Sequence, residues 1–416
     1  MSFRSPTAME PLAPNITDQL KDKATDVIRR SASLSGALQP QTLDSIIDMM
    51  RLTNSYYSNR IEGNDTHPVE VQKALWATEA RKSDENALRE QSVIHVHIQK
   101  DIQQHLFGKP PDYVTSFDFI SWLHRSFYEN LPDELCWIKN ETTGKTEQVI
   151  PGEMRTRLVE VGRHVAPDSD CLAAFFDRFH TFYDIEKLHG IDGVILSGAA
   201  HHRLAWLHPF LDGNGRVARL FTDAYLTSSG VQGYGLWNVS RGLARDVEQY
   251  RSLLAAADSQ RQGDLNGRGN LSLSHLTRFS EYFLDICLDQ IDFMAKALSI
   301  ETFSQRIEGY INLRAAGMLP SLTDTADTKL KKESFLLLRE ALLRREFPRG
   351  DAMRITGLSE RTARDILRNL VTEGLLISDT EKSPVRLGFP VSAAHYWFPD
   401  LFPELPREAS WQPLIS

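Results

Sequence analysis

The chain has 416 residues but only three cysteines, and it has neither a long apolar run nor an excess of basic residues. Cys136, Cys171 and Cys287 are too few and too widely spaced for a disulfide framework or a four-cysteine zinc site, so we expect reduced thiols. Without a membrane-length apolar stretch or a signal peptide, we expect a cytoplasmic protein that does not contact membranes. The net charge of −8 argues against a surface devoted throughout to nucleic acid, although a local basic patch is compatible with it.

The rest of the composition is that of an ordinary globular protein. Hydrophobic residues make up 41% and charged residues 25%, and the length predicts two to three domains. Helical spacing dominates, so we predict a mainly α fold, with residues 1–15 disordered because they are rich in proline, serine and threonine. A helix is predicted from Thr42, its N-cap, to Gly63-Asn64, because apolar residues recur at Leu43, Ile46, Ile47, Met50, Tyr57 and Ile61.

One central segment has the pattern of strands. Polar and apolar residues alternate over residues 145–165, around Arg157, Val159 and Val161, and Pro151-Gly152 is a turn signal. We therefore predict a β-hairpin set into a helical domain that extends from residue 113 to about 260.

The most informative segment is a loop, His208-Pro-Phe-Leu-Asp-Gly-Asn-Gly-Arg-Val-Ala-Arg219. Small and apolar residues predict buried helices over 193–207 and 216–229, so the loop joins two core helices and its Gly-Asn-Gly lies at the start of the second. Free backbone N–H groups at a helix start, beside glycines that admit close approach, make an anion site. Arg216 and Arg219 are three residues apart on one helical face and reach back to that site.

The side chains of this loop suit phosphate chemistry. Arginine binds phosphate oxygens through a planar fork of donors. Asp212 is a hard oxygen ligand of the kind that holds Mg²⁺ jointly with phosphates, and His208 can accept a proton near neutral pH. The loop therefore contains the parts needed for phosphoryl or nucleotidyl transfer.

Residues 208–219 resemble the Fic family motif, HPFx(D/E)GNGRxxR, at every fixed position. The resemblance covers roughly residues 113–260 and implies a helical core with a β-hairpin flap, for which the hairpin at 145–165 is the candidate. Most Fic proteins transfer AMP from ATP to a hydroxyl side chain of a target protein. Gly215 stands where one branch of the family, which phosphorylates its target, has lysine, and this argues against that branch.

Carried over to this chain, the resemblance implies that His208 deprotonates a target Ser, Thr or Tyr and that Asp212 holds Mg²⁺ on ATP. Arg219 would pair with the γ-phosphate, and the flap would hold an extended target segment by strand addition. The phosphates would be cradled by Gly213, Asn214, Gly215 and Arg216.

Many Fic proteins also carry an inhibitory helix with the pattern (S/T)xxxE(G/N), whose glutamate pairs with the second arginine of the motif. The pattern occurs twice here, at Ser58–Gly63 and at Ser304–Gly309. We assign the inhibitory role to Ser58 and Glu62, because this copy ends a predicted amphipathic helix ahead of the core, and we expect Glu308 to be a solvated helix charge. In some relatives the same glutamate positions water to remove AMP, and that activity stays open.

Two further groups of residues are candidate ligand contacts. Tyr234, Trp237 and Asn238 follow the motif helix and are candidates to pack against the adenine, and of these we assign Asn238 to ATP binding. His201-His202 together with His208 suggest zinc, but the spacing fits no ligand pair, so we expect core histidines instead.

The last segment resembles a winged helix-turn-helix. Helices are predicted over 333–346, 350–356 and 359–373, with a turn at Thr356–Ser359 and a wing over 375–389. The third helix exposes Arg361, Arg364 and Arg368 in one stripe, and residues 331–391 contain 12 basic and 9 acidic residues. Acidic residues interleave with the arginines, so contact with DNA and contact with protein stay equally open.

The sequence thus predicts four regions: 1–110, helical with an inhibitory helix; 113–260, a Fic catalytic domain; 261–329, a helical extension and linker; and 330–416, a winged helix with a proline-rich tail. The leading hypothesis is a protein adenylyltransferase that uses ATP and Mg²⁺, is inhibited by Glu62, and modifies another protein or itself. The alternatives are a DNA-binding regulator whose Fic core senses nucleotide and a Fic enzyme that mainly removes AMP. A homodimer is left open.

Overall fold

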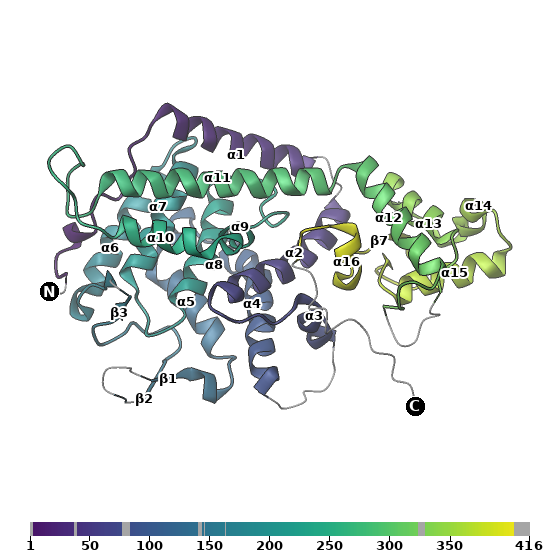
Figure 1. Ribbon diagram of the computed structural model, residues 1–416, viewed down its shortest axis with the longest axis horizontal. Helices are drawn as coiled ribbons and strands as arrows, with labels where there is room; N and C mark the ends of the chain where they lie inside the picture. The colour runs from purple at the N-terminus through teal and green to yellow at the C-terminus, as the bar shows by residue number, and fades with distance from the viewer. Residues whose placement is uncertain are drawn as a thin grey trace. The chain divides into compact units, whose positions relative to one another are not determined.

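The computed structural model describes residues 3–36, 40–76, 84–139, 144, 146–162, 164–322 and 329–402, and it is mainly α-helical (Figure 1). Its contacts divide the chain into two units, residues 1–35 with 50–292 and residues 36–49 with 293–416. The four regions predicted from the sequence are a functional division and stay a prediction. Within the described ranges, no helix combines the length and the apolarity that a membrane crossing requires.

The first unit is built around two helices, α7 (Asp192–Leu207) and α8 (Asn214–Ser228), joined by the motif loop. α7 is buried along almost its whole length because its residues are small or apolar. Both helices were predicted, and they lie in the middle of the unit (Figure 1). α5 (Phe117–Tyr128) packs on α8, and α6 (Leu172–Tyr183) packs on α7. The core side chains that these helices share include Phe119, Leu123, Phe175, Phe179, Leu204 and Phe221.

The remaining helices surround this core. α1 (Asp18–Gly36) runs beside α11 (Leu273–Ala297), where Lys23 pairs with Asp285 and Arg30 with Asp292 (Figure 1). The others are α2 (Pro40–Ile61), α3 (Pro68–Trp76), α4 (Asp84–Leu106), α9 (Val239–Arg245) and α10 (Val247–Ala257).

The predicted helix 42–63 is α2, but its start differs from the prediction. α2 begins at Pro40, so Thr42 lies inside the helix and is not its cap. Proline is favoured in the first turn, because its missing N–H has no partner there in any helix. The end is as predicted, since Gly63 adopts φ 90° directly after the last turn.

The prediction of disorder for residues 1–15 is wrong for the described residues 3–15. Ala8, Met9 and Leu12 are buried. The segment is held by backbone bonds that its composition does not reveal: Arg203 Nη2 donates to Pro11 O (2.7 Å), and the Tyr183 hydroxyl donates to Leu12 O (2.6 Å). Composition failed here because Ala8, Met9 and Leu12 pack into the core with residues that are distant in the sequence.

The hairpin predicted across 145–165 is also corrected. β2 (Thr146–Gln148) pairs with β1 (Trp137–Lys139), and β3 (Glu160–Val161) pairs with β4 (His164–Val165), so the segment belongs to two short hairpins. Gly152 does turn the chain, with φ 77°.

The turn at Gly152 bonds to α5 and not to a partner strand. Its N–H donates to His124 Nδ1 (2.8 Å), and its carbonyl accepts from Ser121 Oγ (2.7 Å). Because the turn is bonded to a helix, the residues on either side of it do not pair with each other.

The second unit contains the three helices predicted near the C-terminus, α13 (Ser334–Arg344), α14 (Ala352–Thr356) and α15 (Glu360–Thr372). Ser359 caps α15 as expected. A three-stranded sheet in the order β5-β7-β6 is built from Glu346–Phe347, which lies between α13 and α14, and from Val385–Leu387 and Leu376–Ile377, which follow α15. α12 (Ile300–Ala315) and α16 (Val391–Trp397) complete the unit; α16 was not predicted, and residues 403–416 of the expected proline-rich tail lie outside the described residues.

An ion pair without solvent exposure joins two of these elements. Arg314 of α12 donates to both carboxylate oxygens of Glu373 after α15, at 2.6 and 2.7 Å, and both side chains are 0% exposed. Tyr310 accepts a further bond from Arg314 (3.0 Å). A buried charge is stable only while its partner is present, so the pair fixes α12 relative to α15.

We therefore expect Glu373→Ala to destabilise the second unit by about 3–5 kcal/mol, because Arg314 would be left buried without its counterion. Chemical unfolding followed by circular dichroism measures this. Glu381→Ala, which removes an exposed glutamate of the same unit, is the control, and equal effects of the two substitutions would contradict the argument.

Candidate functional site

The motif loop is shaped by two left-handed residues and one bridging amide. His208 ends α7 at φ 46° and Gly213 precedes α8 at φ 77°. The Asn214 carboxamide closes the loop, since its Nδ2 donates to Phe210 O and its Oδ1 accepts from Phe210 N, both at 2.9 Å. The Asn214 side chain is therefore used within the loop, and only its backbone N–H is available to a phosphate.

The backbone at His208 and Pro209 is held by Arg155. Arg155, which is buried, donates from Nε to His208 O (2.8 Å), and the Arg155 N–H donates to Pro209 O (2.9 Å). Burial lowers the pKa of His208 to about 4, helped by the neighbouring His164 and Arg155. The imidazole is therefore neutral at neutral pH and can accept a proton.

Asp212 and Arg216 lie at the open side of the loop. Asp212 is exposed, and its Oδ2 accepts a hydrogen bond from the Tyr128 hydroxyl (2.6 Å). The Arg216 guanidinium lies 4.9 Å from the centre of the Phe127 ring, and its buried Nε has no partner among the described residues. Both charged groups thus have capacity left for a ligand.

Arg219 is buried to 3% exposure and is bound by the end of α2. Its Nε donates to Ser58 Oγ (2.9 Å), and its Nη2 donates to Ser58 O (2.9 Å) and to Glu62 Oε1 (2.6 Å). The two residues selected from the sequence pattern therefore meet the second arginine of the motif. Glu308, in the second copy of the pattern, is an exposed residue of α12.

The Glu62 carboxylate is ionised and reaches the start of α8. Burial opposes its ionisation, but the charge of Arg219 and the hydrogen bond from it outweigh burial, so the pKa of Glu62 is lowered. The side chain keeps 34% exposure. A Cβ at Gly215 would collide with Glu62 Oε1, so the carboxylate lies directly against this glycine and would have to shift if position 215 carried a side chain.

α2 and α8 face each other in a series of contacts spaced by four residues. Asn54, Ser58 and Glu62 recur along α2, and Asp223, Arg219 and Gly215 recur in the opposite direction along α8. At the far end Asn54 Nδ2 donates to Asp223 Oδ2 (2.7 Å).

Asp223 also accepts a hydrogen bond from Tyr234 Oη. Burial raises the pKa of Asp223 to about 6, against the opposing hydrogen bonds and the charge of Arg219. Asp223 was not singled out from the sequence, although its four-residue spacing from Arg219 was a signal.

The three residues after α8 that were predicted as candidate nucleotide contacts bond other parts of the protein. Trp237 is fully buried and donates to Ser31 Oγ, and Tyr234 is bonded to Asp223. Asn238 is 3% exposed and caps α9 by accepting from Arg241 N (3.0 Å). These contacts use the Tyr234 hydroxyl, the Trp237 indole N–H and the Asn238 carboxamide oxygen. The Asn238 Nδ2 is buried without a hydrogen-bond partner among the described residues, and a contact with nucleotide stays a prediction.

The core-histidine prediction is confirmed for His201 and His202. His201 bonds Thr222 Oγ1 (2.7 Å) and Tyr250 Oη (2.9 Å), and His202 bonds Leu254 O (3.0 Å). In the part of the chain that the structure describes, no group of three or more His, Cys, Asp or Glu side chains could hold a metal ion.

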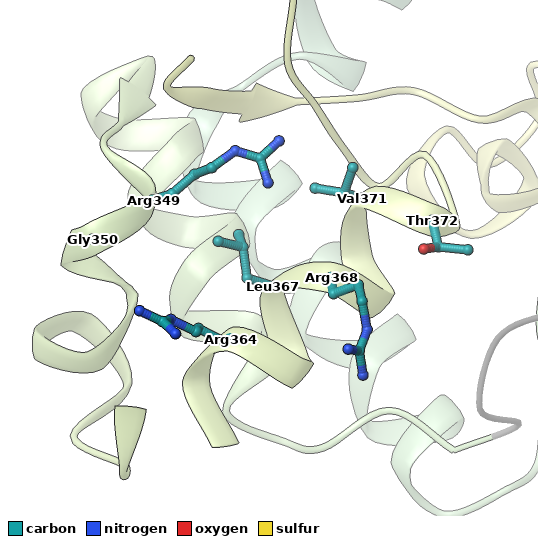
Figure 2. Close-up of a pocket in the computed structure, with 7 residues that line it drawn as sticks. All are labelled: Arg349, Gly350, Arg364, Leu367, Arg368, Val371 and Thr372. Atoms are coloured by element: carbon teal, nitrogen blue, oxygen red, sulfur yellow. The ribbon is translucent and has the colours of Figure 1, made fainter. Parts of the chain in front are cut away.

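A second concave site lies in the C-terminal unit. A cavity of about 470 Å³ is bordered by Arg349, Gly350, Arg364, Leu367, Arg368, Val371 and Thr372 (Figure 2). Figure 2 shows the Arg364 and Arg368 side chains leaving α15 on either side of Leu367. Arg364 and Arg368 pair with Glu360 and Asp365 of the same helix, and Arg361 is exposed beside them.

The comparisons with known proteins agree with the motif. Residues 115–226 match the model of the Fic/DOC family. The chain is 28% identical to the protein adenylyltransferase Fic of Drosophila mojavensis over 179 residues, which are 42% of this chain and 31% of that protein. It is 36% identical to the same enzyme of Drosophila willistoni over 97 residues, 23% of this chain and 20% of that protein. The matched region thus spans less than a third of these relatives.

Solved structures show the same fold at low sequence identity. A Fic family protein from Desulfovibrio desulfuricans G20 superposes with a TM-score of 0.51 at 16% identity, covering 90% of this chain and 98% of that one. Fic-1 from C. elegans superposes with a TM-score of 0.50 at 16% identity, covering 67% and 72%.

The raised pKa of Asp223 yields a pH prediction. A carboxyl with a higher pKa in the folded than in the unfolded state stabilises the fold below about pH 4, and this contribution is lost as pH rises through about 6. The variant Asp223→Asn has no carboxyl to ionise here and should not lose this stability. The unfolding free energy of the variant minus that of the wild type should therefore rise between pH 4 and pH 7. Denaturant unfolding at several pH values measures it, with the exposed Asp264→Asn as control. A constant difference between Asp223→Asn and wild type would contradict the prediction.

Proposed function

Since residues 115–226 form a Fic domain, we propose that this chain is a protein adenylyltransferase, which transfers AMP from ATP to a Ser, Thr or Tyr hydroxyl and is inhibited by its own Glu62. The observation that carries the proposal is the contact of Glu62 and Ser58 with Arg219. An arginine that is placed to bind phosphate, in a loop built for anions, is occupied here by a carboxylate of the same chain.

The transfer needs a base at the attacking hydroxyl and anion donors at the phosphates. In the proposed step His208 takes the proton of the target hydroxyl, whose oxygen bonds the α-phosphorus of ATP. The bond from that phosphorus to the β-phosphate oxygen breaks, and diphosphate leaves. The lowered pKa of His208 supports this role, because the base is unprotonated before the reaction.

The phosphates would lie at the start of α8. The backbone N–H groups of Gly213, Asn214 and Gly215 belong to its first turn, where the helix dipole favours negative charge. Arg216 supports the cradle through its buried Nε, which has no hydrogen-bond partner in the described part of the chain.

The residues present fit Mg²⁺ only if the nucleotide supplies further ligands. Asp212 is exposed and is the one carboxylate of the motif loop, and Mg²⁺ is held in such sites by one or two carboxylates together with phosphates and water. Bound there by Asp212, Mg²⁺ would neutralise charge on the phosphates. The Tyr128 hydroxyl holds the carboxylate in place.

Inhibition would follow from competition for Arg219. The γ-phosphate and Glu62 are both anions that need the same guanidinium, and the side chain of Arg219 is too buried to serve both. While Glu62 is bound to Arg219, ATP would either be excluded or be held with its α-phosphate misaligned for attack by the target hydroxyl.

Glu62→Gly is expected to raise AMP transfer. A hydrogen bond to a charged group contributes about 1.5–3 kcal/mol, so loss of this competitor should increase apparent ATP affinity by about 10- to 100-fold. The measurement is incorporation of ATP labelled at the α-phosphate, into the protein itself and into the proteins of a lysate. Mass spectrometry then identifies a 5′-AMP adduct.

Two matched variants interpret the Glu62 experiment. Glu308→Gly removes the exposed glutamate of the second copy and should have no effect, whereas His208→Ala in the Glu62→Gly background should abolish incorporation. Stimulation by Glu308→Gly but not by Glu62→Gly would overturn the assignment of the inhibitor. Removal of AMP from a modified target by the wild-type protein would instead favour the enzyme that mainly removes AMP.

A second candidate function, contact with DNA, is favoured by the exposed arginines of the C-terminal unit, whose element order agrees with a winged helix. Duplex DNA should bind the full chain at low salt, and replacing Arg361, Arg364 and Arg368 by alanine should lower the slope of log affinity against log salt by about 0.9 per lost phosphate contact. The equally charged control replaces Lys331, Lys332 and Arg339, which are exposed in the same unit. Equal loss in both triple variants, or no binding by wild type, would contradict this candidate.

A further inference from the structure

The hydroxyl of Tyr128 makes a contact that the motif does not predict. Tyr128 is the last residue of α5, is 2% exposed, and donates to Asp212 Oδ2 at 2.6 Å. Asp212 itself is exposed, and its Oδ1 takes no hydrogen bond from the residues that the structure describes. One oxygen of the carboxylate is thus fixed by the protein, and the other remains open.

The Tyr128 ring has little freedom to move away from this position. It lies 4.5 Å from the His124 ring at an interplanar angle of 25°, and His124 stacks in turn on Phe210 at 3.9 Å and 11°. The ring also lies close to the loop at Gly213, where an added Cβ would be 2.8 Å from the ring and 3.0 Å from its oxygen. The ring is packed between α5 and the loop, so the position of the hydroxyl is determined by the core.

The geometry selects one orientation of the carboxylate. An exposed aspartate would otherwise sample several rotamers, and ordering it at the moment of binding would cost conformational entropy. A donor from the protein holds Oδ2, so Oδ1 stays directed away from Tyr128.

We infer that Tyr128 is a positioning residue for Asp212, which presets the carboxylate for the divalent cation that accompanies the nucleotide. The inference rests on the proposed function for the identity of that ligand. Residues that hydrogen-bond a metal-binding side chain orient it, and losing one typically lowers metal affinity by about 10- to 100-fold.

The variant Tyr128→Phe tests this, because it removes one oxygen atom and keeps the ring that fills the core. The matched control is Tyr183→Phe, which removes an equally buried hydroxyl, bonded to Leu12 O at 2.6 Å, from the same unit. Both are made in the Glu62→Gly background, so that the inhibitory carboxylate does not compete with the nucleotide.

The experiment measures the binding of Mg²⁺ and nucleotide, which does not require AMP transfer. Calorimetry with α,β-methylene-ATP at increasing Mg²⁺ gives the Mg²⁺ concentration for half-maximal binding, and Mn²⁺ paramagnetic resonance measures the bound cation directly. We expect Tyr128→Phe to raise that concentration about 10-fold or more. Tyr183→Phe should leave it unchanged, and Asp212→Asn should raise it at least as much as Tyr128→Phe does.

The outcomes separate this inference from the proposed function. An unchanged Mg²⁺ requirement in Tyr128→Phe, or an equal change in Tyr183→Phe, overturns the positioning role. A Glu62→Gly parent that binds the metal and nucleotide but transfers no AMP overturns the proposed function alone. A parent that binds no metal with the nucleotide overturns both.

Discussion

A guanidinium at 3% exposure needs partners, and the arrangement of the candidate site follows from how Arg219 obtains them. The cost of leaving such a charge unpaired is several kcal/mol, so one anion or another must occupy it. In this structure the anion is the Glu62 carboxylate, and the Ser58 hydroxyl accepts a further hydrogen bond from Arg219. In the proposed function, the same requirement would make Arg219 a strong site for a phosphate once the carboxylate leaves, and inhibition and substrate binding would then depend on one side chain.

The contacts around Arg219 differ in kind from those around His208 and Asp212. His208 is held by Arg155, and Asp212 by Tyr128, through groups buried in the core around the motif loop. Arg219 is held instead by the last turns of α2, and Glu62 at the end of that helix keeps 34% exposure. The parts proposed for chemistry are therefore built into the core, whereas the part proposed for control lies on a helix end that a solvent-exposed anion can compete with.

Features that depend on neighbouring residues could be predicted from the sequence, whereas features that depend on contacts between distant segments could not. α7, α8 and α15 were predicted because the spacing of apolar residues and the residues that end a helix can be recognised within one short segment. The hairpin at 145–165 was wrong because strand pairing was assigned to neighbours, whereas Gly152 bonds to α5 and β2 pairs with β1. The helix cap that the Asn238 carboxamide oxygen makes on α9 was not predicted, whereas the contact of Asn238 with nucleotide stays a prediction.

By itself the sequence determined the motif residues from His208 to Arg219, the helices that carry them and the two copies of the inhibitory pattern, because each depends on spacing within one segment. The choice between the copies is different, since it depends on which glutamate lies near Arg219. Only the tertiary structure brought Glu62 to Arg219, Asn54 to Asp223 and Tyr128 to Asp212. These partners are far apart in the chain, and the periodicity of a single sequence does not indicate which distant residues will be in contact.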